Sequence, residues 1–148
     1  MHTCARPIWL MMFNRFYQTD IDVETLEVVP HLALSRSDEL LLRVNWVAIV
    51  YGQVKADLAI TGGVHTAVDV LKSMMAGARV AMMTSALLEN GIDHIRVVLR
   101  ELADWMQAHE YEAVRQMQGS MSREAVPEAS AIERGNDVRV RSRGQVGQ

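Results

Sequence analysis

Residues 56–91 read ADLAITGGVHTAVDVLKSMMAGARVAMMTSALLENG and decide the fold class. Two short apolar runs, 56–61 and 79–84, have the length of a strand and lack the alternation of a half-exposed one. Between them, Thr66 and Asp69 have the spacing of a helix capping box. A strand, a helix and a strand in this order predict two parallel strands joined by a right-handed crossover.

Upstream of this stretch, the sequence predicts one more strand and one more helix. The strand is the apolar run 8–13, and a long irregular connection follows it, in which a hairpin formed by 26–29 and 32–34 is expected. Ser37 is a favourable helix N-cap with acidic residues after it, so a helix is expected from there to about Tyr51. The three strands should lie side by side and parallel, in chain order.

Downstream, residues 85–90 are expected to form a turn, and Asp93 to open a long helix. A short helix near 112–117 should follow. From Ser122 the chain is rich in charged and small residues and poor in large apolar ones, so residues 122–148 are predicted to be a disordered tail. The long helix should pack through an apolar stripe formed by Ile95, Leu99, Leu102 and Met106.

Composition limits the class of protein. The chain has 148 residues, of which 49% are hydrophobic and 22% charged, as in an ordinary globular domain. A formal net charge of −3 argues against a nucleic-acid surface. The single cysteine, Cys4, cannot form an internal disulfide and suits a reducing cytosol. No apolar run reaches the roughly 20 residues of a membrane helix, and no signal peptide is recognisable, so a cytoplasmic location is expected.

Both strands of the central stretch end in residues suited to binding an anion. Gly62 and Gly63 follow the first strand, and glycines let the backbone N–H groups approach a ligand closely. Thr84 and Ser85 follow the second strand and add hydroxyl groups. The carboxyl ends of parallel strands meet at one edge of a sheet, where α/β barrels commonly bind phosphate. These features predict a phosphate site, with a tight turn that binds no ligand as the alternative.

Taken together, these motifs resemble the last two βα units of dihydroorotate dehydrogenases. FNRFYQTDID, RVNWVAIVYGQVKADLA and YEAVRQMQGSMS are similar to one branch of that family, the dihydroorotate dehydrogenase-like proteins. The resemblance covers roughly residues 8–122. It implies that residues 1–121 form the C-terminal part of an FMN-binding TIM (β/α)8 barrel, strands six to eight, because a complete barrel takes about 250 residues.

The resemblance also implies a function and roles for residues. The family oxidises the CH–CH group of dihydroorotate to give orotate in pyrimidine biosynthesis, with FMN as cofactor. Asn14 corresponds to an asparagine that binds the orotate ring, and Arg15 stands where better-known members have Ser or Thr. An arginine there can pair with a carboxylate in a bidentate manner. The residues that correspond to the contacts of the FMN phosphate are Gly62, Gly63, Thr84 and Ser85.

No catalytic residue is expected in this chain, because the family's base and its flavin-contacting lysine belong to earlier strands. Cys4 lies in a different context, HTCARP, and is not expected to be the base. The histidines lack the spacing of metal ligands, so no metal is expected. His65 follows the glycine pair and is expected to be an exposed loop residue, with an approach to the phosphate as the alternative. The expected partners are a small substrate such as dihydroorotate and another copy or the missing part of the barrel. A non-catalytic module that binds phosphate or flavin, or that assembles with a partner, is the alternative.

Overall fold

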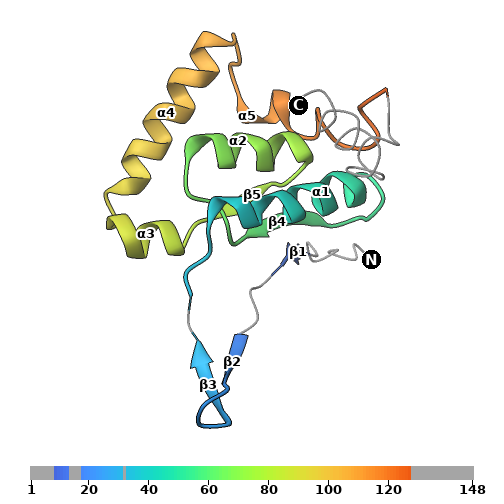
Figure 1. Cartoon of the computed structure of the whole chain (residues 1–148). Coiled ribbons are helices and arrows are strands. Elements are labelled where there is room, and N and C mark those ends of the chain that lie inside the picture. The colour runs from blue at the N-terminus through green and yellow to red at the C-terminus, as the bar shows by residue number, and fades with distance from the viewer. Residues whose placement is uncertain (1–8, 14–17, 32, 128–148) are drawn as a thin grey trace, which may run out of the picture.

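The computed structural model describes residues 9–13, 18–31 and 33–127. It is a mixed α/β structure in which a parallel three-stranded sheet carries the helices and a two-stranded hairpin stands apart (Figure 1). The elements in chain order are β1 (Trp9–Met12), β2 (Gln18–Asp22), β3 (Glu27–His31), the 3-10 turn η1 (Ser37–Glu39), α1 (Leu40–Val50), β4 (Asp57–Thr61), α2 (Ala67–Ala76), β5 (Val80–Met82), α3 (Ser85–Asn90), α4 (His94–Ala108) and α5 (Val114–Met117).

The sheet has the strand order β1-β4-β5, and both neighbouring pairs are parallel. Met12 of β1 lies beside Ile60 of β4, and Thr61 of β4 lies beside Met82 of β5. Strand β4 has a neighbour on each side, and its three middle residues are buried. The prediction of three parallel strands in chain order is therefore confirmed.

Helices α1 and α2 cover one face of the sheet, and α4 packs against α2 farther from the strands (Figure 1). Apolar side chains fill the space between these helices and the strands, so the core is built mainly from residues close to the central strand. Its largest members are Met12, Leu40, Val47, Leu58, Ile60 and Val64.

The other face of the sheet lacks such a cover in the described part of the chain. Met12 is buried on the side of α1, whereas its neighbour Met11 is 44% exposed and Trp9 is 50% exposed. Alternate residues of a strand point to opposite faces, so Trp9 and Met11 belong to the open face. Among the described residues, β1 pairs only with β4, and its outer edge is therefore open as well.

Helix α2 begins and ends as the sequence predicts. The hydroxyl of Thr66 accepts a hydrogen bond from the Asp69 N–H, and the Asp69 carboxylate accepts one from the Thr66 N–H at 3.0 Å. The helix ends at Gly77, whose φ of 122° favours glycine. A Cβ atom there would overlap the ring of Tyr51. The capping box and the terminal glycine that the sequence predicts are therefore both present at the ends of α2.

The helix expected from Ser37 to Tyr51 is α1 together with the turn η1. Arg36 is the N-cap of η1, so Ser37 lies inside the turn rather than capping α1. Its hydroxyl donates instead to the carboxylate of Asp69 at 2.9 Å. Helix α1 ends at Val50, with Tyr51 as the C-cap.

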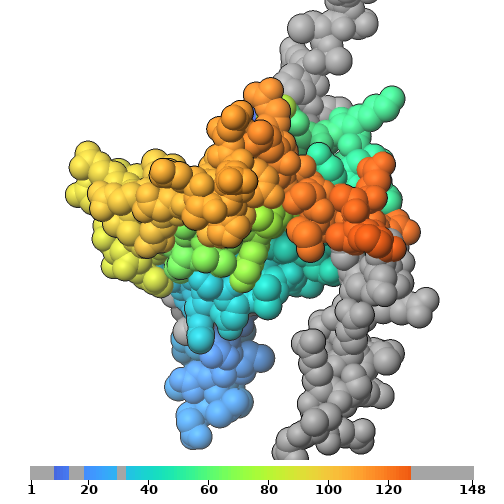
Figure 2. All heavy atoms as spheres, turned by 90° about the horizontal axis from the view of Figure 1, so that it is seen from above, coloured from blue at the N-terminus to red at the C-terminus, as the bar shows by residue number. Residues whose placement is uncertain are grey.

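The hairpin exists, but its predicted bounds are wrong: residues 27–29 belong to its second strand rather than its first, and residues 33 and 34 are not in a strand. Its strands are β2 and β3, which pair in antiparallel fashion from Asp22 opposite Glu27 outward. The turn lies nearer the N-terminus than predicted. The Asp22 carboxylate stabilises it there by accepting hydrogen bonds from the N–H groups of Glu24 and Thr25. The hairpin projects beyond the helices (Figure 2), and its apolar side chains, Leu26 among them, are exposed.

Two further expectations differ from the structure downstream of β5. Residues 85–90 form the helix α3 rather than a turn, and the Asn90 side chain donates to the Ala86 carbonyl within it. Helix α4 starts after Asp93 as expected, yet Val98 is its buried residue, while Ile95 and Leu99 of the predicted stripe are exposed. Leu102 and Met106 of the stripe are half-buried, and α4 packs against α2, so the predicted stripe is covered only in part. In the described ranges, no helix is long and apolar enough to cross a membrane.

The start of the predicted tail at Ser122 belongs to the packed body. Ser122 is buried, and the Arg123 N–H donates to the Ala48 carbonyl at 2.8 Å. Just before it, Gly119 has a φ of 76° and lies against the ring of Tyr51, where a Cβ atom would overlap. The described residues therefore extend to residue 127. Residues 128–148 of the predicted tail lie outside them.

Candidate functional site

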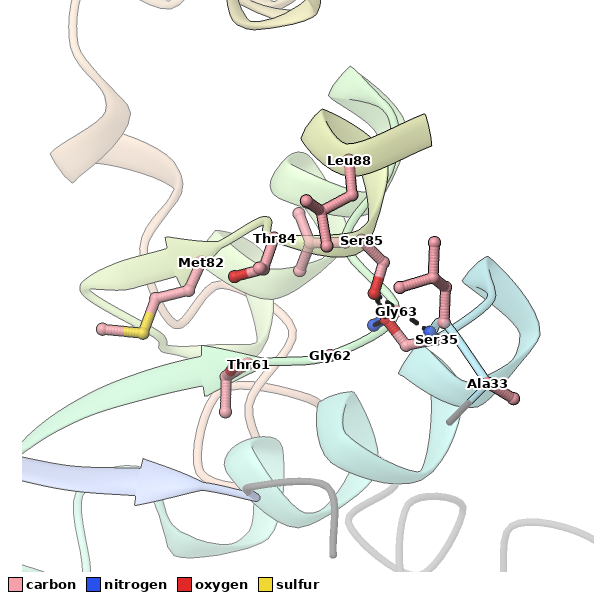
Figure 3. Close-up of a pocket in the computed structure, with 11 residues that line it drawn as sticks. Ala33, Ser35, Thr61, Gly62, Gly63, Met82, Thr84, Ser85 and Leu88 are labelled. Atoms are coloured by element: carbon pink, nitrogen blue, oxygen red, sulfur yellow. Dashed lines mark hydrogen bonds between the residues drawn. The ribbon is translucent and has the colours of Figure 1, made fainter. Parts of the chain in front are cut away.

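A cavity of about 300 Å³ opens at the carboxyl edge of the sheet, where β4 and β5 end (Figure 3). The segment before η1 forms a third wall, and the α3 residue Leu88 closes one side. The sequence-predicted residues Gly62, Gly63, Thr84 and Ser85 all line it. Two βα turns that are 21 or more positions apart in the sequence thus share one cavity.

The two glycines occupy the left-handed region, with φ of 83° for Gly62 and 81° for Gly63. Gly63 is also required by packing, because a Cβ atom would lie 2.6 Å from the backbone nitrogen of Leu40. At Gly62 the atoms nearest to a Cβ atom would be those of the Arg43 side chain, at 3.0 to 3.2 Å. The positive φ favours glycine at both positions. At Gly63 the close backbone of Leu40 also leaves no room for a Cβ atom.

Ser35 joins the two turns and was not singled out from the sequence. Its hydroxyl accepts the Gly63 N–H at 3.1 Å and donates to the Ser85 hydroxyl at 2.8 Å (Figure 3). The Ser85 hydroxyl also accepts the Ser35 N–H at 3.0 Å. In this arrangement the Gly63 N–H is already used, whereas the Thr84 side chain makes no capping hydrogen bond to α3. No short spacing in the sequence singles out Ser35, and its burial depends on the packing of distant elements.

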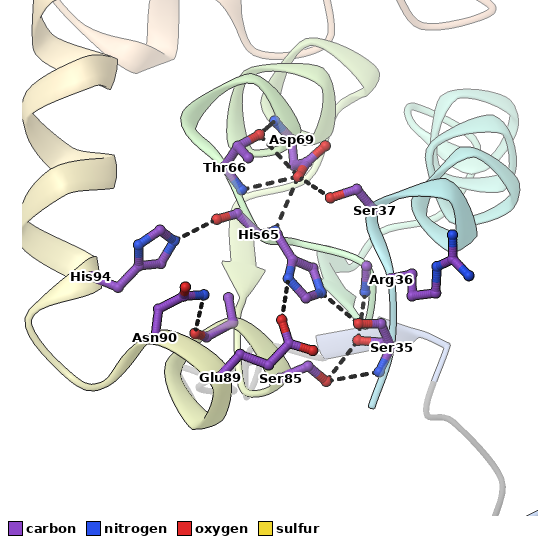
Figure 4. Close-up of polar contacts among 12 residues, drawn as sticks. Ser35, Arg36, Ser37, His65, Thr66, Asp69, Ser85, Glu89, Asn90 and His94 are labelled. Atoms are coloured by element: carbon purple, nitrogen blue, oxygen red, sulfur yellow. Dashed lines mark hydrogen bonds and ion pairs between the residues drawn. The ribbon is translucent and has the colours of Figure 1, made fainter. Parts of the chain in front are cut away.

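A second network of hydrogen bonds lies next to the residues that line the cavity (Figure 4). The buried Asp69 carboxylate accepts from the N–H groups of His65 and Thr66, each at 3.0 Å, and from the Ser37 hydroxyl. One side chain thereby ties η1, the glycine turn and α2 together, which limits how far the cavity can change shape.

His65 is not the exposed loop residue that the sequence predicts, because its side chain is only 13% exposed. Its Nε2 lies 2.6 Å from the Ser35 carbonyl, and its Nδ1 lies 3.7 Å from a Glu89 carboxylate oxygen (Figure 4). A carbonyl only accepts, so Nε2 carries the proton. His94 in turn places its Nε2 2.8 Å from the His65 carbonyl. His65 therefore joins α3 and α4 to the segment before η1.

The hydroxyl groups of Ser35 and Ser85 and the His65 ring are engaged in hydrogen bonds within the protein. The Ser35 and Ser85 hydroxyls are bonded to each other, and the His65 ring faces a carbonyl instead of a hydroxyl. A nucleophile needs a base within hydrogen-bond reach. What the edge offers is hydroxyl and amide donors, which suit an oxyanion.

No protein-family model matches the chain, and no curated protein sequence is significantly similar to it. The other predicted site residues, Asn14 and Arg15, and the cysteine Cys4 lie outside the described residues. Within those residues, no group of three or more His, Cys, Asp or Glu side chains is placed to hold a metal ion.

Proposed function

We propose that this chain is the C-terminal part of a (β/α)8 barrel of the dihydroorotate dehydrogenase-like type and that its carboxyl edge binds the phosphate of FMN. One observation carries the proposal: Gly62, Gly63, Thr84 and Ser85, from two successive βα turns, line the same cavity. In α/β barrels the corresponding loops after the last two strands commonly bind phosphate. Parallel strands with helical crossovers on one face are consistent with three adjacent barrel units.

The size of the cavity supports a phosphate-bearing fragment rather than a whole nucleotide. At about 300 Å³ it lies at the lower end of the usual range of roughly 300–1,000 Å³ for ligand pockets. The donors nearest a phosphate would be the Thr84 and Ser85 hydroxyls and the backbone at Gly62. The flavin ring would need further contacts from the strands that complete the barrel.

FMN supplies hydride acceptance when bound, and the residues of this chain bind and orient it. Asn14 and Arg15 follow β1, which runs parallel to β4, so we propose that they contact the substrate at the same edge. The base belongs to other strands in this family. The proposed role of the chain is thus half of a flavin site in an oxidoreductase.

An assembly module is the second candidate, and the open face of the sheet favours it. Trp9 and Met11 present apolar surface there, and β1 has an open edge among the described residues. Unpaired edges and apolar patches are typical of surfaces that bind another chain. This candidate predicts assembly without any affinity for phosphate.

Titrating the full chain with FMN and with inorganic phosphate tests the proposal. Thr84→Val removes an exposed hydroxyl that caps no helix, so it should leave the fold intact. We expect phosphate affinity to fall about tenfold, as for the loss of one hydrogen bond to a charged group. Thr19→Val on the hairpin is the matched control and should change nothing. Equal phosphate affinity in Thr84→Val and the parent chain would contradict the site, and assembly without phosphate binding would favour the second candidate.

A further inference from the structure

The hairpin of β2 and β3 has two faces of different character. Ile21 lies opposite Val28, and Asp22 lies opposite Glu27. Residues that face each other across two strands lie on the same side of the ribbon, and successive residues of a strand lie on opposite sides. Ile21 and Val28 therefore form an apolar face. The acidic face carries three carboxylates beside Val29, those of Asp20, Asp22 and Glu27.

The apolar face is uncovered. Ile21 is 65% exposed and Val28 is 66% exposed. In the described part of the chain, β2 and β3 pack extensively only with each other, and the hairpin projects away from the helices (Figures 1 and 2). A hairpin of two strands is marginally stable by itself and needs a third strand or another packed element. The structure thus points to an element that covers this hairpin.

The charge of the hairpin limits what that element is. Residues 18–31 contain no lysine or arginine, and they contain four acidic residues, Asp20, Asp22, Glu24 and Glu27. Like charges that face each other across two strands are destabilising, so a second hairpin of the same kind is a poor partner. The suitable partner is a strand with apolar residues on one side and cations on the other.

A segment near the C-terminus has this pattern. Residues 137–143 read DVRVRSR, in which Val138 and Val140 alternate with Arg139 and Arg141. A period of two gives a strand one apolar side and one cationic side. From position 138 to the end of the chain there are three arginines and no acidic residue. Its charge and its apolar pattern are both complementary to those of the hairpin.

The chain is long enough for this segment to reach the hairpin. The described body ends beside α1, where the Arg123 N–H donates to the Ala48 carbonyl. Helix α1 has 11 residues and a length of about 16 Å, and its first turn follows the hairpin through η1. The roughly ten residues from position 127 to 137 span up to about 33 Å when extended. Attachment to the same chain also raises the effective concentration of the segment at the hairpin.

We propose that residues 137–143 bind the hairpin of the same chain as a third strand. Val138 and Val140 extend its apolar face, and Arg139 and Arg141 lie beside its carboxylates. A segment of low hydrophobicity can become ordered when it binds a complementary surface. The inference goes beyond the proposed function, because neither the hairpin nor this segment belongs to the cavity at the carboxyl edge.

Amide hydrogen exchange of the full chain, followed by NMR at several protein concentrations, tests the proposal. We expect the amides of residues 138–141 to exchange about tenfold or more slowly than in an unstructured peptide. Ile21→Lys and, separately, the double variant Arg139→Glu/Arg141→Glu should abolish this protection. Ile21 is exposed, so its replacement should leave the amides of α2 unchanged. Arg134→Glu, in the same tail but outside the alternating stretch, is the matched control and should keep the protection.

Free exchange of residues 138–141 in the parent chain would overturn the inference. Protection that survives both Ile21→Lys and the double arginine variant would overturn it as well, because the segment would then bind elsewhere. Protection that appears only as the protein concentration rises would assign the pairing to a second copy and contradict pairing within one chain. The double arginine variant leaves the hairpin sequence unchanged, so it decides the question even if Ile21→Lys unfolds the hairpin.

Discussion

The hydroxyl groups of Ser35 and Ser85 lie 2.8 Å apart, although the residues are separated by 50 positions in the chain. Ser35 precedes η1, and Ser85 is the first residue of α3. Since Ser35 also accepts the Gly63 N–H, this contact sets the distance between the two turns of the candidate site.

Replacing Ser35 with alanine should destabilise the fold by about 1–3 kcal/mol, because the buried Gly63 N–H loses its acceptor. Urea unfolding followed by circular dichroism measures the change. Ser120→Ala, at an exposed position, is the matched control and should stay within about 0.5 kcal/mol of the parent. Equal stabilities of the two variants would show that the Ser35 contact contributes nothing.

Two glycines with nearly the same φ make a matched pair for testing steric fit. Gly63 and Gly91 have φ of 81° and 82°, but a Cβ atom meets the Leu40 backbone at Gly63 and open space at Gly91. Gly91→Ala should cost only the backbone penalty of about 1–3 kcal/mol, because φ of 82° with ψ of 166° is a conformation adopted almost only by glycine. Gly63→Ala should cost clearly more, and Gly63→Val should prevent folding. The melting temperatures of the variants measure these differences in stability. Equal decreases in melting temperature for the two alanine variants would contradict the close packing of Gly63 against Leu40.

The hairpin should loosen in acid because of Asp22. The N–H groups of Glu24 and Thr25 donate to its carboxylate and hold its pKa below the ordinary value of 3.8. A depressed pKa in the folded state means that the stabilisation is fully present above about pH 4 and is lost as the pH falls through the folded-state pKa. Amide NMR signals of residues 22–27 should report this loss. Asp22→Asn should remove the transition, and a transition of unchanged midpoint in that variant would assign it to another group.

The full chain should self-associate through the open face of the sheet. Exposed apolar residues and a bare strand edge favour pairing with another chain. Met11→Lys places a charge on that face without touching the core and should shift sedimentation towards the monomer. Val23→Lys, which likewise replaces an exposed apolar residue by lysine but lies on the hairpin, is the control. A compact parent monomer at all concentrations would rule out association through this face.

Dihydroorotate oxidation by the full chain with FMN should be negligible. In the proposed assignment the general base lies on other strands of the barrel, and loss of a placed general base alone costs about 10²–10⁴-fold in rate. Anaerobic flavin reduction, followed by absorbance, measures it. Reduction at a rate typical of enzymes, about 10 per second, would show that this chain carries a base of its own.

The elements near the glycine pair could be predicted because their signals are local. The Thr66–Asp69 box and the terminal Gly77 act within one helix, and both lie where expected. The long-range contacts could not be predicted in this way. Burial of His65, the Ser35 hydroxyl bond and the exposure of Leu99 depend on which elements meet, and a single sequence does not encode that in any short spacing. The hairpin was misplaced because the side-chain hydrogen bonds of Asp22 set its turn, rather than the apolar pattern.

The ring of Tyr51 has a consequence for synthesis of the protein. It lies at the end of α1 and contacts Gly77 after α2 and Gly119 after α5. While the chain is being made, α1 and the first strands leave the ribosome long before Gly119 does. The residues against which the ring packs are therefore incomplete until the segment 119–123 has emerged. Packing of the earliest helix is completed by some of the last residues of the body, so a ribosome that stalls before them would hold a chain with an incomplete core.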